Sequence, residues 1–253
     1  MTVAASPSPL ARVWSARWPF AAELVLFLVL NVAYEWLRDL VAVEDLAAPL
    51  AHAALVIYVE KALGLFVEPD LHDWVQSVPA AKFITTWAYT LGHTAGFTVM
   101  FLWVWFRRRE NFAVFRNWFW ITNGLAILGY WILPLAPPRL AGIGLSDPTK
   151  ESLKLGGSLD WFQPFRNEFA AMPSMHVGYS FLFALTLFFM LAPSRWRWLA
   201  FAWPATMLFV VMATANHWWL DGVGGVTCVL IGLLIVTRVS DPSMLRPWER
   251  AAR

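Results

Sequence analysis

The chain has 253 residues, of which 59% are hydrophobic and 14% are charged, and its formal net charge is +2. Average soluble domains are about 45–50% apolar and about 25% charged, so the composition argues against a soluble enzyme, and the small net charge argues against a nucleic-acid partner. The single cysteine, Cys228, excludes an intrachain disulfide framework and a cysteine-based zinc site.

Six apolar segments are long enough to be membrane spans, because a helix needs about 20 mostly apolar residues to cross a bilayer. They are residues 18–36, 84–106, 118–135, 175–192, 198–215 and 220–237. Tryptophans lie at or near the ends of most of them, as interface anchors do. The sequence therefore predicts an all-α polytopic membrane protein, with residues 1–253 forming one membrane domain.

The seventh apolar segment, residues 46–68, has a different pattern. Its large apolar side chains follow helical spacing on one face, whereas Glu60 and Lys61 fall on the opposite side. Two charges at mid-depth in a bilayer are costly. We therefore expect an amphipathic helix on the membrane surface or against the bundle rather than a seventh span.

Lysine and arginine placement predicts the orientation. With a cytoplasmic N-terminus, twelve of the nineteen lysine and arginine residues lie inside, and the short loop 107–109 carries the strongest signal. The first apolar run lacks a nearby cleavage site, so we expect it to remain as a span. The prediction is an integral plasma-membrane protein with both termini cytoplasmic and the outer ends of spans three to six on the extracytoplasmic face.

Polar residues suited to phosphate chemistry gather at those outer ends. His217 and Asp221 are four residues apart, so on a helix the carboxylate could fix the tautomer of the imidazole. Ser174 suits a helix N-cap, and His176 in the following turn could protonate a leaving oxygen. Arg139 follows two prolines, and its planar guanidinium matches phosphate oxygens.

Each of these residues also has an ordinary explanation. A histidine or arginine at a membrane interface can be amphipathic filler, a serine before a helix can be only a cap, and an aspartate can be a partner for the helix dipole. Residues that served such separate purposes need not converge on one face. Their combination therefore favours a phosphate site.

Three motifs in this region resemble those of the type 2 phosphatidic acid phosphatase superfamily. They are Ala136-Pro137-Pro138-Arg139, Pro173-Ser174-Met175-His176 and His217-Trp218-Trp219-Leu220-Asp221, in the family's order. The resemblance covers about residues 118–237, the expected catalytic core. The Ala-Pro-Pro-Arg form is similar to that of the branch containing inositol phosphorylceramide synthases.

The resemblance implies a role for each matching residue. His217 would be the nucleophile that forms a phosphohistidine, Asp221 would orient it, and His176 would protonate the leaving group. Arg139 and Ser174 would hold the phosphoryl oxygens. The family requires no metal, so the resemblance implies neither a metal nor another cofactor.

Two cations of the family's phosphatase pattern are missing, because their positions hold Ile132 and Val211. Phosphoryl transfer still needs compensation of the developing charge. The long connection between residues 136 and 172 contains three cations that could replace them: Lys150, Lys154 and Arg166. These could equally be solvated loop residues.

The sequence thus predicts a metal-independent membrane enzyme that acts on a lipid phosphate. Its partners would be membrane lipids and either water, for hydrolysis, or an alcohol such as inositol, for transfer. A lipid or ion transporter and an inactive scaffold with the same fold are the alternatives. A transporter would place His and Asp deep on span faces, whereas here they lie at span ends.

Overall fold

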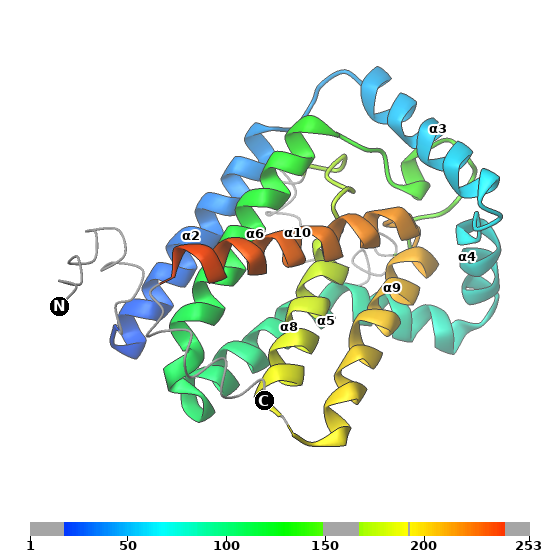
Figure 1. Cartoon of the computed structure of the whole chain (residues 1–253). Helices are drawn as coiled ribbons and strands as arrows, with labels where there is room; N and C mark the ends of the chain where they lie inside the picture. Colours follow the sequence, from blue (N-terminus) through cyan, green and yellow to red (C-terminus); the bar gives the residue numbers. More distant parts are fainter. Residues whose placement is uncertain (1–17, 149–166, 192, 241–253) are drawn as a thin grey trace, which may run out of the picture.

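The structure is a computed structural model that describes residues 18–148, 167–191 and 193–240 (Figure 1). Its regular elements are all helical, with one isolated β-bridge between Leu135 and Ala170. The expected all-α class is therefore confirmed. Three of the predicted site residues, Lys150, Lys154 and Arg166, lie outside the described residues.

Each of the six apolar segments corresponds to helical structure. The α-helices are α2 (Phe20–Leu40), α3 (Ala47–Ala62), α4 (Glu68–Ser77), α5 (Pro79–Arg107), α6 (Phe112–Ile132), α8 (Met175–Met190), α9 (Ala202–Ala213) and α10 (Trp219–Val239). The short 3-10 helices are η1 (Arg109–Asn111), η2 (Pro138–Leu140) and η4 (Arg195–Phe201).

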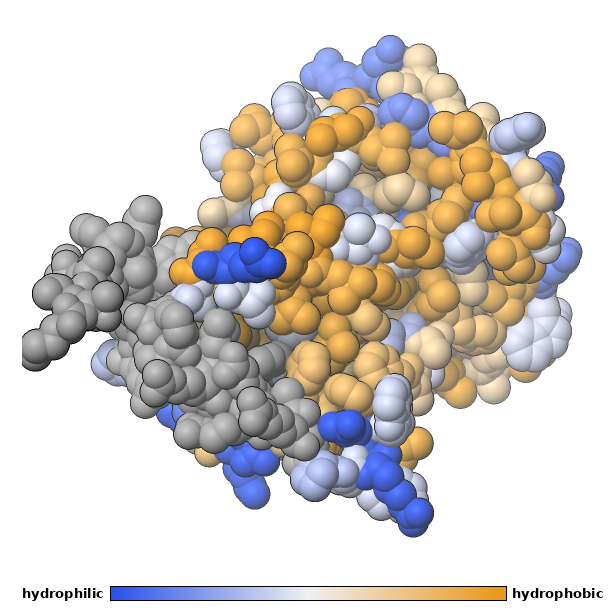
Figure 2. All heavy atoms as spheres, in the orientation of Figure 1, coloured by the Kyte–Doolittle hydropathy of each residue, from blue (hydrophilic) through white to orange (hydrophobic). Residues whose placement is uncertain are grey.

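Three of these helical segments are long and apolar enough to cross a membrane, namely α2, η4 with α9 (Arg195–Ala213), and α10. Their outward side chains are largely apolar, and Figure 2 shows hydrophobic residues over much of one face of the molecule. Helix α8 is apolar but has 16 residues. The protein thus has helices suited to a membrane, whereas the crossing of α5, α6 and α8 stays a prediction.

Residues 46–68 differ from the single amphipathic helix expected. The chain turns at Gly64, whose φ of +68° is in the left-handed region that glycine adopts readily, and α4 begins at Glu68. The expected apolar face is turned outward, with Tyr58 71% exposed. The buried face of α3 contains Glu60, which has no exposed surface. The side of the helix that carries Glu60 therefore faces the protein, whereas Lys61 is exposed.

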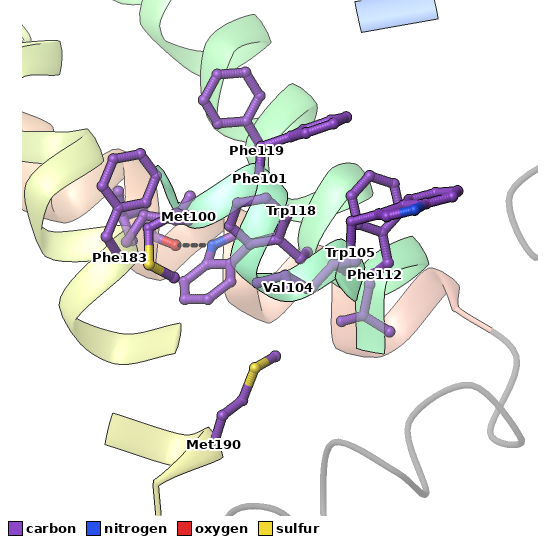
Figure 3. Packing of buried hydrophobic residues seen from close by; sticks show 14 residues of the cluster. Met100, Phe101, Val104, Trp105, Phe112, Trp118, Phe119, Phe183 and Met190 are labelled. Carbon is purple, nitrogen blue, oxygen red and sulfur yellow. Dashed lines mark hydrogen bonds between the residues drawn. The ribbon is translucent and has the colours of Figure 1, made fainter. Parts of the chain in front are cut away.

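The core forms where α10 packs against α6 and α8, and where α8 also packs against α5 and α9. Trp118 of α6 is fully buried, and its indole Nε1 donates to the carbonyl of Val229 in α10 at 2.8 Å (Figure 3). Aromatic and aliphatic side chains surround it, including Phe101 and Phe119. This packing fixes the position of α10 along α6.

Glu23, in the first turn of α2, lies in the interior of the protein. It is 2% exposed, and its Oε1 is 2.6 Å from Nη1 of Arg116 in α6. A buried charge is tolerated when it is paired and hydrogen-bonded. The pair therefore joins α2 to α6.

Candidate active site

The three motifs meet in space although tens of residues separate them in sequence. Arg139 lies in η2, Ser174 precedes α8, and His176 lies in the first turn of α8. His217 precedes α10, and Asp221 lies in its first turn. The ring centroids of His176 and His217 are 5.7 Å apart. The structure thus brings together five of the eight residues that the sequence suggested.

The geometry of His217 defines its tautomer. Nδ1 is 2.9 Å from the carbonyl oxygen of Ala171 and 3.2 Å from Oδ2 of Asp221. Both groups accept hydrogen bonds, so Nδ1 carries the hydrogen and Nε2 keeps its lone pair. Burial lowers the pKa of His217 to about 3, and the nearby charge of Arg139 contributes in the same direction. The imidazole is therefore neutral at neutral pH.

Asp221 is held by the backbone as well as by His217. It has no exposed surface, and its Oδ2 accepts a hydrogen bond from the backbone N–H of Trp218 at 2.9 Å. The buried indole of Trp218 donates to the carbonyl of Ala136 at 3.0 Å. Trp218 therefore connects the His-Asp segment to the Ala-Pro-Pro-Arg segment.

The turn before His217 has an unusual backbone. Ala215 has a φ of +53°, which non-glycine residues seldom adopt. Its carbonyl accepts from the backbone N–H of Arg139 at 3.0 Å, and the carbonyl of Val211 accepts from the N–H of His217 at 3.2 Å. The surrounding hydrogen bonds thus hold a strained turn beside the two functional segments.

Ser174 occupies the predicted N-cap position of α8, but its side chain makes no capping hydrogen bond. Its Oγ is buried and has no hydrogen-bond partner in the described structure, while its N–H donates to the carbonyl of Asp221 at 2.9 Å. A Cβ added to Gly225 of α10 would lie 2.2 Å from the carbonyl oxygen of Ser174. Only glycine permits this close approach of α8 and α10.

His176 is partly exposed and stacks on Tyr89 of α5, with the ring centroids 4.3 Å apart and an interplanar angle of 18°. The stack fixes the plane of the imidazole that faces His217. Tyr89 was absent from the residues suggested by the motifs. It lies within a long apolar helix, so only the three-dimensional arrangement reveals it.

Arg139 is also held by a residue that the sequence did not suggest. Its Nε is 3.0 Å from Oδ2 of Asp147, and the two side chains are 7% and 16% exposed. The ion pair fixes the direction of the guanidinium beside His217. Asp147 lies just before the undescribed segment 149–166, where no motif singles it out.

The two positions that lack the family's cations differ in their surroundings. Ile132 at the end of α6 is 64% exposed, whereas Val211 in α9 is fully buried. Neither side chain can carry the positive charge that the family's phosphatase pattern has at these positions. Within the described segments, no group of three or more His, Cys, Asp or Glu side chains is arranged to hold a metal ion.

Comparisons with known proteins agree with the motif pattern. Residues 54–235 match the family described as the PAP2 superfamily. A protein of Bacteroides thetaiotaomicron named phosphoinositol dihydroceramide synthase is 26% identical over 247 residues, covering 85% of this chain and 75% of that protein. No solved structure matches the chain.

Proposed function

We propose, from the premise that the chain belongs to the PAP2 superfamily, that it is an integral membrane enzyme acting on a lipid phosphate through a phosphohistidine. The observation that carries this proposal is the state of His217. Its Nδ1–H is engaged by Ala171 and Asp221, so Nε2 is available as a nucleophile. The neighbouring ring of His176 gives the site a second imidazole for proton transfer.

In the first step, Nε2 of His217 attacks phosphorus in line and forms a P–N bond. The bond from phosphorus to the leaving oxygen breaks, and protonated His176 gives its proton to that oxygen. Asp221 keeps the Nδ1–H of His217 in place and stabilises the positive charge that develops on the ring. Stacking on Tyr89 holds His176 in the orientation that this transfer requires.

The phosphoryl oxygens need donors and positive charge. Arg139, whose charge already acts on His217, and the unpartnered Oγ of Ser174 supply these within the described structure. Lys150, Lys154 and Arg166 remain our proposed source of the charge that Ile132 and Val211 do not provide. Replacing all three by alanine should weaken turnover and substrate affinity, and unchanged values of both would remove this part of the proposal.

In the second step, an acceptor attacks phosphorus and releases His217. Water as acceptor makes the protein a phosphatase, and an alcohol makes it a transferase. The relative is named as a synthase of phosphoinositol dihydroceramide, and this name favours transfer to an alcohol over hydrolysis. We place the site on the extracytoplasmic face of a six-span protein with cytoplasmic termini, and we include independence from metal in the proposal.

The test uses the full chain in detergent with an excess of chelator. Phosphatidic acid, a polyprenyl phosphate and phosphatidylinositol are supplied singly, with and without inositol or dihydroceramide, while released phosphate and new phospholipid are measured. His217→Ala should lower turnover by at least about 10³-fold, because loss of a nucleophile removes the covalent route. A labelled substrate should leave an acid-labile, alkali-stable phosphoryl group on the wild type alone.

His52→Gln is the matched control, because His52 is a partly buried histidine whose Nδ1, like that of His217, contacts a backbone carbonyl, here that of Pro134 at 2.7 Å. It should retain turnover. Activity that survives His217→Ala would refute the phosphohistidine mechanism. Binding or transport of lipid without turnover in the wild type would favour the transporter, and a folded protein without either property would favour the scaffold.

A further inference from the structure

The first turn of α10 carries Asp221, and carboxyl groups from two other helices contact its backbone. A helix begins with N–H groups that have no partner within the helix. Here the N–H of Trp219 donates to Oε1 of Glu68 at 2.9 Å, and the N–H of Leu220 lies 3.5 Å from Oε1 of Glu60. The helix start next to His217 is therefore held from outside by α3 and α4.

The turn between α3 and α4 brings the two glutamates together. Glu60 lies in the last turn of α3 and Glu68 is the first residue of α4, and the left-handed conformation of Gly64 reverses the chain between them. Neither glutamate has exposed surface. Because their oxygens contact the N–H groups of consecutive residues, Trp219 and Leu220, the two carboxyl groups lie next to each other.

Two buried carboxyl groups in contact cannot both be ionised without repulsion. Burial, with a further contribution from Glu68, raises the pKa of Glu60 to about 9, and burial also raises the pKa of Glu68. Glu68 accepts hydrogen bonds from the N–H groups of Trp219 and Val67, as a carboxylate does. Oε2 of Glu60 accepts no hydrogen bond in the described structure, so no donor there stabilises a negative charge on it.

Among the described residues, the charged and titratable groups nearby do not compensate a second negative charge on the pair. Asp221 of α10 is a third carboxyl group that acts on Glu60. Lys61 lies over the ring of Phe66, with Nζ 4.9 Å from its centroid. His72 of α4 is engaged by the carbonyl of Ala213 and the hydroxyl of Ser146.

We propose that Glu60 and Glu68 form a carboxyl pair that shares one proton, clamps the first turn of α10 and so positions Asp221 and His217 for attack. The inference rests on the proposed function, and it assigns a purpose to α3 and α4 that the three motifs do not include. Both glutamates are positioning residues, because their contacts are with the backbone of α10. Loss of the shared proton places two negative charges side by side and loosens the clamp.

The experiment compares pH profiles of turnover between pH 6 and pH 10.5 in the wild type, Glu60→Gln and Glu68→Gln. A single group with a pKa of about 9 loses nine-tenths of its proton by one pH unit above that value, so this loss should lower wild-type kcat about tenfold by pH 10, beyond any fall from loss of the catalytic proton of His176, which every variant shares. In Glu60→Gln the amide has no proton to lose, so between pH 8 and pH 10 its kcat should fall about tenfold less than that of the wild type. Glu68→Gln removes the charged partner of the helix start and should lower kcat about tenfold or more at every pH, with KM changed less than about threefold.

Glu35→Gln is the matched control, because Glu35 is a 42% exposed carboxylate paired only locally with Arg38. It should keep the wild-type profile. A wild-type kcat that falls no further above pH 9 than that of Glu60→Gln, or full turnover in Glu68→Gln, would overturn the inference.

Hydrogen exchange of the peptide covering residues 216–222 gives a readout independent of turnover. Compared at equal pH, the wild type should lose protection above pH 9 while Glu60→Gln keeps it. If no lipid phosphate is turned over by the wild type but the exchange difference appears, the proposed function fails and the clamp stands. Equal exchange in the two proteins overturns the clamp. If Glu68→Gln does not fold, the Glu60→Gln comparison still decides.

Discussion

Gly225→Ala should separate the two halves of the candidate site. The added Cβ would lie 2.2 Å from the carbonyl oxygen of Ser174, whereas carbon–oxygen contacts in proteins are about 3.3 Å or longer. Helices α8 and α10 must therefore move apart by about 1 Å, since the obstructing atom belongs to the backbone and no side-chain rotation can relieve the contact. That movement changes the distance from His176 to His217.

A misplacement of about 1 Å between reacting groups can cost about 10²-fold in rate. Overpacking in a tight interface costs about 1–3 kcal/mol in stability. We expect Gly225→Ala to lower kcat about 10²-fold and to lower the melting temperature by several degrees, measured with the lipid phosphate assay and by thermal unfolding in detergent.

Gly124→Ala is the matched control, because Gly124 is also helical and an added Cβ there would meet no atom within 4 Å. It should keep turnover and melting temperature near those of the wild type. If Gly225→Ala also retained wild-type turnover and stability, the close approach of α8 and α10 could not be what sets the geometry of the site.

Three further predictions concern buried charge, backbone strain and protonation. Arg116→Met should cost about 3–5 kcal/mol of stability because it leaves the carboxylate of Glu23 buried without its ion-pair partner; a Glu23→Met, Arg116→Met double variant that is no more stable than the single one would contradict this. Ala215→Val should lower the melting temperature while Ala215→Gly should not, since a β-branched residue is disfavoured at a φ of +53°; equal melting temperatures would show that the turn is unstrained. The pKa of His217 is lowered to about 3, so the unfolded chain binds the extra proton between about pH 6.5 and pH 3, and stability should fall on acidification across that window; in His217→Asn this part of the fall should disappear in thermal unfolding curves.

Apolar runs and motif spacing were enough to predict the helical class and the meeting of Arg139, Ser174, His176, His217 and Asp221. The apolar segments predicted the helices because each helix needs a long apolar stretch, and short polar turns separate one stretch from the next. The meeting of the motifs was predictable because all three lie at the ends of helices that the predicted topology places on one face. The apolar segments show how many helices lie between the motifs, and that number determines on which face each motif falls.

Sequence periodicity could not predict where Glu60 points. A helix with one apolar and one polar side can present either side to the protein, and in a membrane the apolar side can face lipid. Here Tyr58 faces outward and Glu60 faces inward. The choice depends on the N–H groups at the start of α10, which are distant in sequence and have no signature of their own.

The pairing of Arg139 with Asp147 and the stacking of Tyr89 on His176 were unpredictable for a similar reason. Each contact joins a motif residue to a side chain outside every motif. A pairwise contact between distant segments leaves no periodic trace in one sequence. The left-handed backbone of Ala215 was also unpredictable, because a glycine at that position would indicate such a conformation and an alanine does not.

Helices α8 and α10 both begin at this site. Their N-terminal ends, where a helix carries partial positive charge, are capped differently. The start of α10 is surrounded by protein carboxyl groups, from Asp221, Glu68 and Glu60, whereas the Ser174 side chain leaves the start of α8 without a side-chain cap. A helix start favours anions, so an oxyanion that mimics the transition state, such as vanadate, should approach from the side of α8. Inhibitors that mimic the transition state should therefore be built outward from Ser174 rather than from α10.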